Sequence, residues 1–192
     1  MTEIEQVRLD MGGFEVNSYV VYAPEGDLIV DAGAEPEKIM AALQKPVVAI
    51  LITHGHHDHV NALKDVRRET DAPVYAHPAD ADGAGVQDYE PLRDGEDLVM
   101  AGETFHVLHT PGHSPGSVTF VVGKDQILGD LILPGSVGRT DLAGASWEEI
   151  EVSLRRVMPL WDDSTRLYAG HGPVLEAMEE LRSNPYLPLG VV

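Results

Sequence analysis

The chain of 192 residues contains no cysteine. Disulfide bonds and thiolate metal sites are therefore excluded, and any metal ion must be held by histidine, aspartate or glutamate. Long apolar runs are also missing, because the longest aliphatic stretch is the six residues from Val47 to Ile52, whereas a membrane-spanning helix needs about 20. The acidic start, Met1 to Glu5, does not have the pattern of a signal sequence. We therefore expect a soluble cytoplasmic protein that does not enter membranes.

Basic residues are scarce. The 13 lysines and arginines stand against 32 aspartates and glutamates, which gives a formal net charge of −19. Nucleic acids and anionic membranes bind basic surfaces, so neither is an expected partner. A hydrophobic content of 43% is ordinary for a folded protein, and 19 Gly with 13 Pro indicate many turns. The length suits one domain, residues 1–192, and the composition leaves the oligomeric state open.

The apolar pattern predicts two blocks of strands, each followed by helices. In the first block we expect strands at 7–11, 14–16, 17–22, 28–30, 47–52 and 73–76, and helices at 35–43 and from His59 onward. In the second block we expect strands at 98–100, 104–110, 118–122, 126–128 and 166–169, and helices after Ser146 and at 175–182. Such an order predicts an α/β fold in which two packed sheets carry helices outside, a four-layer αββα sandwich.

Two segments have more specific expectations. Residues 78–95 are polar and without periodicity, which predicts a surface loop with at most one helical turn, and the acidic region 78–97 is expected to be a solvated face. Ser146 and Glu149 have the spacing of a capping box, in which Ser146 accepts from the amide of Glu149 while the glutamate reaches back.

The stretch Thr53 to His59 carries the strongest chemical signal, because it places histidines and a carboxylate in a loop after a predicted buried strand. In an extended loop, residues two apart point to the same side. His54 and His56 can therefore converge on one ion, while Asp58 and His59 can address a second. Further candidate ligands follow predicted strands in glycine-rich settings: His113, Asp130 and His171.

These motifs, His-x-His-x-Asp-His, then Pro-Gly-His, Gly-Asp and Gly-His-Gly, resemble the metallo-β-lactamase superfamily over positions 31 to 171. The segments Gly138 to Leu142, Gly170 to Pro173 and Asn184 to Leu187 resemble the short glyoxalase II-like (hydroxyacylglutathione hydrolase-like) hydrolases. The chain ends shortly after the last motif, so we expect it to lack the helical C-terminal domain with which full-length glyoxalase II binds glutathione.

The resemblance implies a binuclear metal site with seven ligands: His54, His56 and His113 on the first ion, Asp58, His59 and His171 on the second, and Asp130 bridging both. Zinc is the first expectation for the two divalent ions, with iron or manganese as alternatives. The implied reaction is hydrolysis of a small thioester, such as S-lactoylglutathione, by a metal-bridging hydroxide. Asp58 is the implied catalytic proton shuttle.

Two other functions fit the same motifs. One is a persulfide dioxygenase, which shares the framework and the Gly-Arg-Thr-Asp loop but uses a single iron held by two histidines and one aspartate. The other is a metal-binding protein without turnover. A flavodiiron-type reductase is disfavoured, because that branch resembles His-x-Glu-x-Asp and position 56 is histidine. A nucleic-acid-processing member is disfavoured by the charge and by the missing insert domain.

Several polar residues near these motifs are ambiguous. Asp31 matches a family position where a carboxylate orients a ligand imidazole, and it equally fits an Asx turn that closes a strand. For Arg139 we favour a pair with Asp141 over a contact with a substrate carboxylate. The remaining four histidines are expected to have ordinary structural or solvent-exposed roles: His57, His77, His106 and His109.

Overall fold

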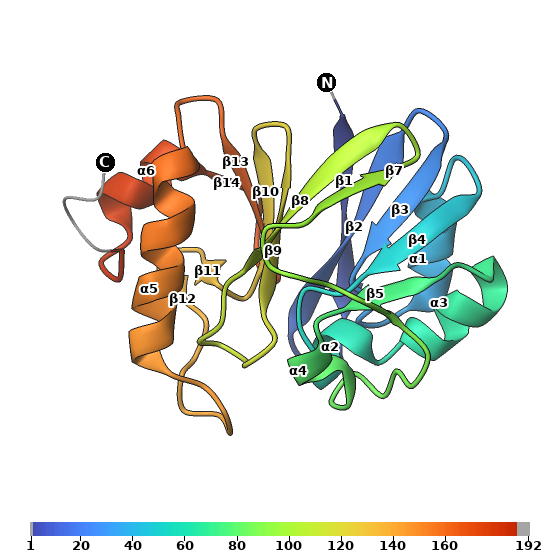
Figure 1. The fold of residues 1–192 in the computed structure, drawn as a ribbon, viewed down its shortest axis with the longest axis horizontal. Coiled ribbons are helices and arrows are strands. Elements are labelled where there is room, and N and C mark those ends of the chain that lie inside the picture. The colour runs from blue at the N-terminus through green and yellow to red at the C-terminus, as the bar shows by residue number, and fades with distance from the viewer. Residues whose placement is uncertain (1, 188–192) are drawn as a thin grey trace.

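Two six-stranded sheets face each other in the computed structural model, which describes residues 2–187, and helices cover both outer faces (Figure 1). The first sheet has the order β1-β2-β3-β4-β5-β6, with the bounds β1 Glu3–Asp10, β2 Glu15–Ala23, β3 Gly26–Val30, β4 Val47–Leu51, β5 Val74–Ala76 and β6 Glu90–Pro91. The second has the order β14-β13-β10-β9-β8-β7, with the bounds β7 Asp97–Met100, β8 Glu103–His109, β9 Val118–Val122, β10 Asp125–Gly129, β13 Arg166–Ala169 and β14 Leu175–Glu176.

The helices divide between the two outer faces. The first half of the chain contributes α1 Pro36–Ala42, α2 His57–Val60, α3 Leu63–Thr70 and α4 Pro78–Ala81. The second half contributes α5 Trp147–Val157, the 3-10 turn η1 Met158–Leu160 and α6 Ala177–Ser183, beside a small hairpin of β11 Ile132–Leu133 and β12 Ser136–Val137. Among the described residues, no helix combines the length and the apolar character that crossing a membrane requires.

Three apolar layers explain why the sheets stack. Between the sheets, Tyr19 meets Tyr168 edge to face with ring centroids 5.4 Å apart, and Phe105 and Phe120 fill the same layer. Val20, one residue from Tyr19, lies instead in the outer layer against the first-half helices. A third layer joins the second sheet to α5 through residues such as Ile150. Strand β2 is thus buried on both faces, and the predicted αββα sandwich is confirmed.

Some boundaries differ from the sequence-based expectation. Strand β1 begins at Glu3, and the two short strands expected at 14–16 and 17–22 are the single strand β2. The helix expected from His59 begins at His57 and is interrupted between α2 and α3. At the interruption the amide of Ala62 donates to the carbonyl of Ala32 at 2.9 Å instead of continuing the helical ladder. This contact fixes the helix segment against the end of β3.

Candidate metal centre

The motif Thr53 to His59 leaves the carboxyl end of β4 next to Asp31, which follows the parallel neighbour β3. Asp31 is buried and has a φ of 59°, a left-handed conformation that is uncommon for an aspartate. Its carboxylate accepts from the amide of Thr53 at 2.8 Å and from the hydroxyl of Thr53 at 2.6 Å. These two hydrogen bonds fix the start of the histidine loop against the end of β3.

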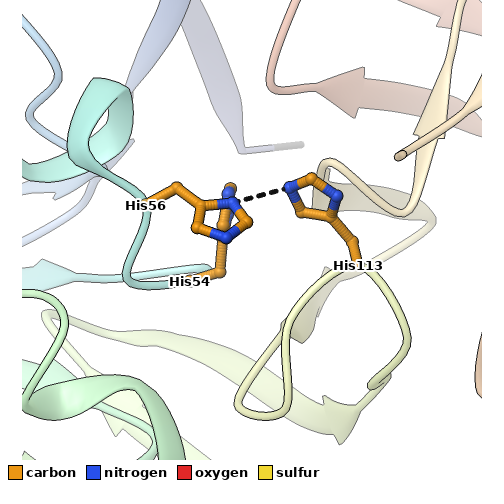
Figure 2. A group of neighbouring side chains, drawn as sticks. All are labelled: His54, His56 and His113. Atoms are coloured by element: carbon orange, nitrogen blue, oxygen red, sulfur yellow. Dashed lines mark hydrogen bonds between the residues drawn. The ribbon is translucent and has the colours of Figure 1, made fainter. Parts of the chain in front are cut away.

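The first group of side chains consists of His54, His56 and His113, one nitrogen atom of each lying within 4.8 Å of the others (Figure 2). His56 Nδ1 and His113 Nε2 are 2.8 Å apart. His113 Nδ1 donates to the carbonyl of Arg139 at 3.0 Å, so its Nε2 carries the lone pair. His54 Nδ1 lies 3.1 Å from the hydroxyl of Thr53. Each outer contact turns the remaining ring nitrogen toward the centre.

The second group consists of Asp58, His59 and His171, whose ligating atoms also lie within 4.8 Å of one another. His59 Nδ1 donates to Asp31 at 2.7 Å, and His171 Nδ1 donates to the carbonyl of Glu15 at 2.6 Å. His171 Nε2 lies 3.2 Å from Asp58 Oδ2. Of the two roles expected for Asp31, the structure contains the first: its carboxylate orients the imidazole of His59.

Asp130 lies between the two groups. One carboxylate oxygen is 3.4 Å from His59 Nε2, and the other is 3.4 Å from both His113 Nε2 and His171 Nε2. Gly170 permits this approach, because a Cβ at that position would collide with the carboxylate of Asp130 and with the ring of His59. All seven side chains predicted as ligands therefore meet in one place.

The charges of the centre are strongly coupled. Burial opposes a charge on His59, yet Asp130 and Asp31 raise the pKa of its imidazole well above the usual 6.5. Burial also opposes a charge on His171, but hydrogen bonds with Asp130 and Asp58 raise the pKa of its imidazole to about 10. Burial also opposes ionisation of Asp130, while His59 holds the pKa of this carboxyl well below 3.8. The carboxylates of the centre thus stabilise positive charge on the groups next to them.

His54 and His56 show the opposite behaviour. Burial lowers the pKa of His54 well below 6.5, and the neighbouring His59 adds to this lowering. Burial, followed by the proximity of His113, also lowers the pKa of His56. Neutral imidazoles have a free lone pair, which is the form that binds a metal ion.

Three unpartnered atoms test whether a metal fits this centre. His54 Nε2, His59 Nε2 and Asp130 Oδ1 are buried and have no hydrogen-bond partner among residues 2–187. Buried polar atoms are rarely left without a partner, and three of the eight such side-chain atoms among the described residues meet in this one constellation. A set of imidazole and carboxylate ligands without thiolates suits zinc, iron or manganese. The residues present therefore fit divalent metal ions.

The open side of the centre is a cleft of about 420 Å³. Four apolar side chains and one arginine line it together with five of the centre's own residues: Phe14, Leu133, Val137, Leu142 and Arg139 beside His56, Asp58, His113, Asp130 and His171. Arg139 is exposed and forms a bidentate pair with Asp141 at 2.7 and 2.8 Å. The predicted structural pairing of Arg139 is confirmed, although the same side chain borders the cleft.

The four histidines expected to be ordinary lie outside the centre. His57 is exposed, and His106 contacts Asp97 at 2.6 Å. His77 and His109 stack with ring centroids 4.2 Å apart. Every potential metal-binding group found among residues 2–187 is built from the centre already described and Asp31, without these four histidines.

Two expectations about polar residues were wrong in part. The region 78–97 is not uniformly solvated, because Asp80 is buried and contacts the loops of the first group. Ser146 does accept from the amide of Glu149 at 3.3 Å, but the amide of Ser146 donates to the carbonyl of Gly112 at 2.8 Å. Half of the predicted capping box is therefore replaced by a contact with the loop that carries His113.

Fold and site together define a metal-binding protein of the αββα class. The sequence model of the metallo-beta-lactamase superfamily matches residues 11–171. The chain belongs to this superfamily. The "Probable metallo-hydrolase YqgX" of Bacillus subtilis is 36% identical, over 94% of this chain and 96% of that protein. "Hydroxyacylglutathione hydrolase GloC" of Haemophilus influenzae is 29% identical, over 91% of this chain and 93% of that protein.

Solved structures give the same picture. TTHA1623 "in a di-iron-bound form" has a TM-score of 0.79 and 38% identity, covering 94% of this chain and 99% of that one. BLEG-1 B3 metallo-beta-lactamase has a TM-score of 0.85 and 31% identity, covering 96% and 99%. ETHE1 from Myxococcus xanthus has a TM-score of 0.82 and 28% identity, covering 96% and 84%.

Proposed function

We propose that this chain is a binuclear metal-dependent hydrolase that cleaves a small thioester, as a glyoxalase II-like enzyme does with S-lactoylglutathione. The observation that carries the proposal is Asp130, which lies 3.4 Å from imidazoles of both groups at the floor of an open cleft. A single carboxylate between two three-ligand groups is the arrangement of a two-metal hydrolytic site. The similarity to GloC supports the thioester substrate.

Under this proposal, His54, His56 and His113 would hold one ion, Asp58, His59 and His171 would hold the other, and Asp130, which lies between the two groups, would serve both. Zinc is the first expectation, and the di-iron form of TTHA1623 supports iron as an alternative. Divalent ions in such a site supply an acidified water and a Lewis acid for the substrate carbonyl. The remaining steps belong to the protein's own side chains.

Asp58 borders the cleft and carries the proton in this scheme. In the metal-free chain burial opposes its ionisation, but the hydrogen bond from His171 lowers the pKa of its carboxyl. With metal bound, the positive charge of the ion would take the place of this hydrogen bond and would likewise keep the carboxylate ionised as an acceptor at neutral pH. It takes the proton of the attacking water while the new C–O bond forms, and it returns this proton to the thiolate when the C–S bond breaks. The apolar walls, Phe14, Leu133 and Leu142, hold the organic part of the substrate.

The test is hydrolysis of S-lactoylglutathione by metal-loaded protein, beside a panel of other thioesters, lactones and β-lactams. We expect turnover of the thioester to exceed that of free metal and to fall by at least about 100-fold in His54→Ala, because one ligand of the first ion is lost. Equal rates for the wild type and His54→Ala would contradict the proposal. Metal binding without turnover of any compound in the panel would identify a binding protein instead.

The second candidate is a mononuclear iron persulfide dioxygenase, which the similarity to ETHE1 from Myxococcus xanthus favours. Metal analysis separates the two candidates. One iron per chain with oxygen uptake on glutathione persulfide supports the dioxygenase, whereas two ions per chain with thioester cleavage support the hydrolase.

A further inference from the structure

We propose that Asp80 is a positioning residue that sets the geometry of the first metal-binding group, an inference that rests on the metal site of the proposed function. Asp80 lies in α4, outside every metal-binding motif of the sequence, and it is 7% exposed. Its carboxylate faces the two loops that carry His54, His56 and His113. A buried carboxylate is costly unless its oxygens are satisfied, so its contacts define its role.

Three donors from the two loops satisfy Asp80. One oxygen accepts from the amide of Gly55 at 2.9 Å and from the hydroxyl of Ser114 at 2.5 Å. The other accepts from the amide of Gly116 at 2.6 Å. Gly55 is the residue between His54 and His56, and Ser114 directly follows His113. One side chain therefore joins the two halves of the first group by charge-assisted hydrogen bonds.

Close packing makes the contact specific. A Cβ at Gly55 would lie 2.5 Å from the carbonyl oxygen of Asp80, and a Cβ at Gly116 would lie 2.6 Å from its carboxyl carbon. Both loops thus approach Asp80 more closely than a side chain at either glycine would permit. At the base of the loops, the amide of Val118 donates to the carbonyl of Thr53 at 2.9 Å. Asp80 adds the constraint nearer the histidines, where their separation is set.

The second group does not depend on this contact. The His171 loop is held from the opposite side, where Asn17 Nδ2 donates to the carbonyls of Ala169 and Gly172 at 2.8 and 2.9 Å. The ring of His59 is fixed by Asp31. Loss of Asp80 should therefore lower the affinity of the first group for its ion and leave the affinity of the second group unchanged.

The experiment compares zinc retention in the wild type, Asp80→Asn and Asp82→Asn during titration with a chelator. Asparagine keeps the shape of Asp80 but places an NH2 group where an acceptor is needed, so at least one of the three bonds is lost. We expect the affinity for one of two zinc ions to fall by about 10- to 100-fold in Asp80→Asn. Asp82 is exposed at the end of the same helix. The variant Asp82→Asn removes the same charge without disturbing these contacts, so it should retain both ions.

Two further measurements keep the outcome decisive. Thermal melting of the metal-free variants checks that the fold is intact, and imidazole NMR signals report which histidines lose the metal. Gly55→Ala and Gly116→Ala should reproduce the selective loss. The inference is overturned if Asp80→Asn keeps both ions with wild-type affinity, or if it loses both together with the folded state. Wild-type protein that binds two ions but cleaves no thioester would contradict the proposed function and leave this inference standing.

Discussion

The residues at the centre are of two kinds: side chains that face the centre, and side chains that hold the first kind in position. Asp31 shows the second role: one carboxylate fixes the Thr53 amide and hydroxyl and also accepts from His59. Local spacing predicts four of the seven side chains that face the centre, His54, His56, Asp58 and His59, whereas His113, Asp130 and His171 are predicted because their motifs resemble those of the metallo-β-lactamase superfamily. Asp80 has no such local signal, since its partners lie 25, 34 and 36 positions away and two of them are backbone amides.

Arg139 offers a test at the same scale. Arg139→Ala and Asp141→Ala should raise KM for the substrate by a similar factor, on the order of two- to fivefold, because either change breaks the same exposed pair beside the cleft. Steady-state kinetics of the two variants measure this, with Lys124→Ala as a control that breaks a different exposed pair. A much larger effect of Arg139→Ala than of Asp141→Ala would show that the guanidinium contacts the substrate directly.

Among the elements, α5 couples local capping to the site. Its first residue follows Ser146, whose side chain caps the helix while its amide contacts Gly112 in the His113 loop. Gly112 has a φ of 132°, and a Cβ there would collide with Ile150, at 2.4 Å from its amide nitrogen and 2.5 Å from its Cγ1. The helix therefore packs directly on the loop that presents a predicted ligand.

This arrangement predicts unequal effects at the two capping-box positions. Ser146→Ala should lower the free energy of unfolding by about 1 kcal/mol, because the amide of Glu149 loses its acceptor. Glu149→Ala should have little effect, since Glu149 does not bond the Ser146 amide. Denaturant unfolding of both variants measures the difference. An equal loss in the two variants would indicate that the full capping box forms in solution.

The success of the sequence-based prediction follows the length of each element. Strands such as β4 and β9 and the stripe of α5 were predicted because their apolar periodicity spans several residues. Strands β6, β11, β12 and β14 have two residues each and were missed, since two residues carry no period. The break between α2 and α3 was also missed, because it depends on a tertiary contact from Ala62 to Ala32.

For the whole molecule, the coupled charges predict how stability depends on pH without metal. The pKa of His171 is raised from 6.5 to about 10 in the folded chain, and that of His59 is also raised. The stabilising contribution of His171 is complete below pH 6.5 and is lost as pH rises through about 10. That of His59 is likewise complete below pH 6.5 and is lost as pH rises through its raised folded pKa. Asp58 and Asp130, whose pKa values are lowered, contribute above pH 3.8 and lose this contribution as pH falls through their folded values.

Metal-free protein should therefore melt at progressively lower temperature between pH 6.5 and 10, whereas metal-loaded protein should change less, since the ions replace the protons. Thermal melting at several pH values in a chelator, and again with zinc, measures both curves. His171→Gln should flatten the metal-free curve. An unchanged slope in this variant would contradict the assigned coupling.

The division of the chain between the two sheets has a last consequence. Residues up to Pro91 form β1 to β6, and residues from Asp97 onward form β7 to β14. His54, His56, Asp58 and His59 belong to the first of these halves, whereas His113, Asp130 and His171 belong to the second. Neither half contains all of the first group or all of the second group, so under the proposed ligation each ion would be a cross-link between the two halves of the chain. The metal content per chain would then report whether the two sheets have come together, independently of any substrate.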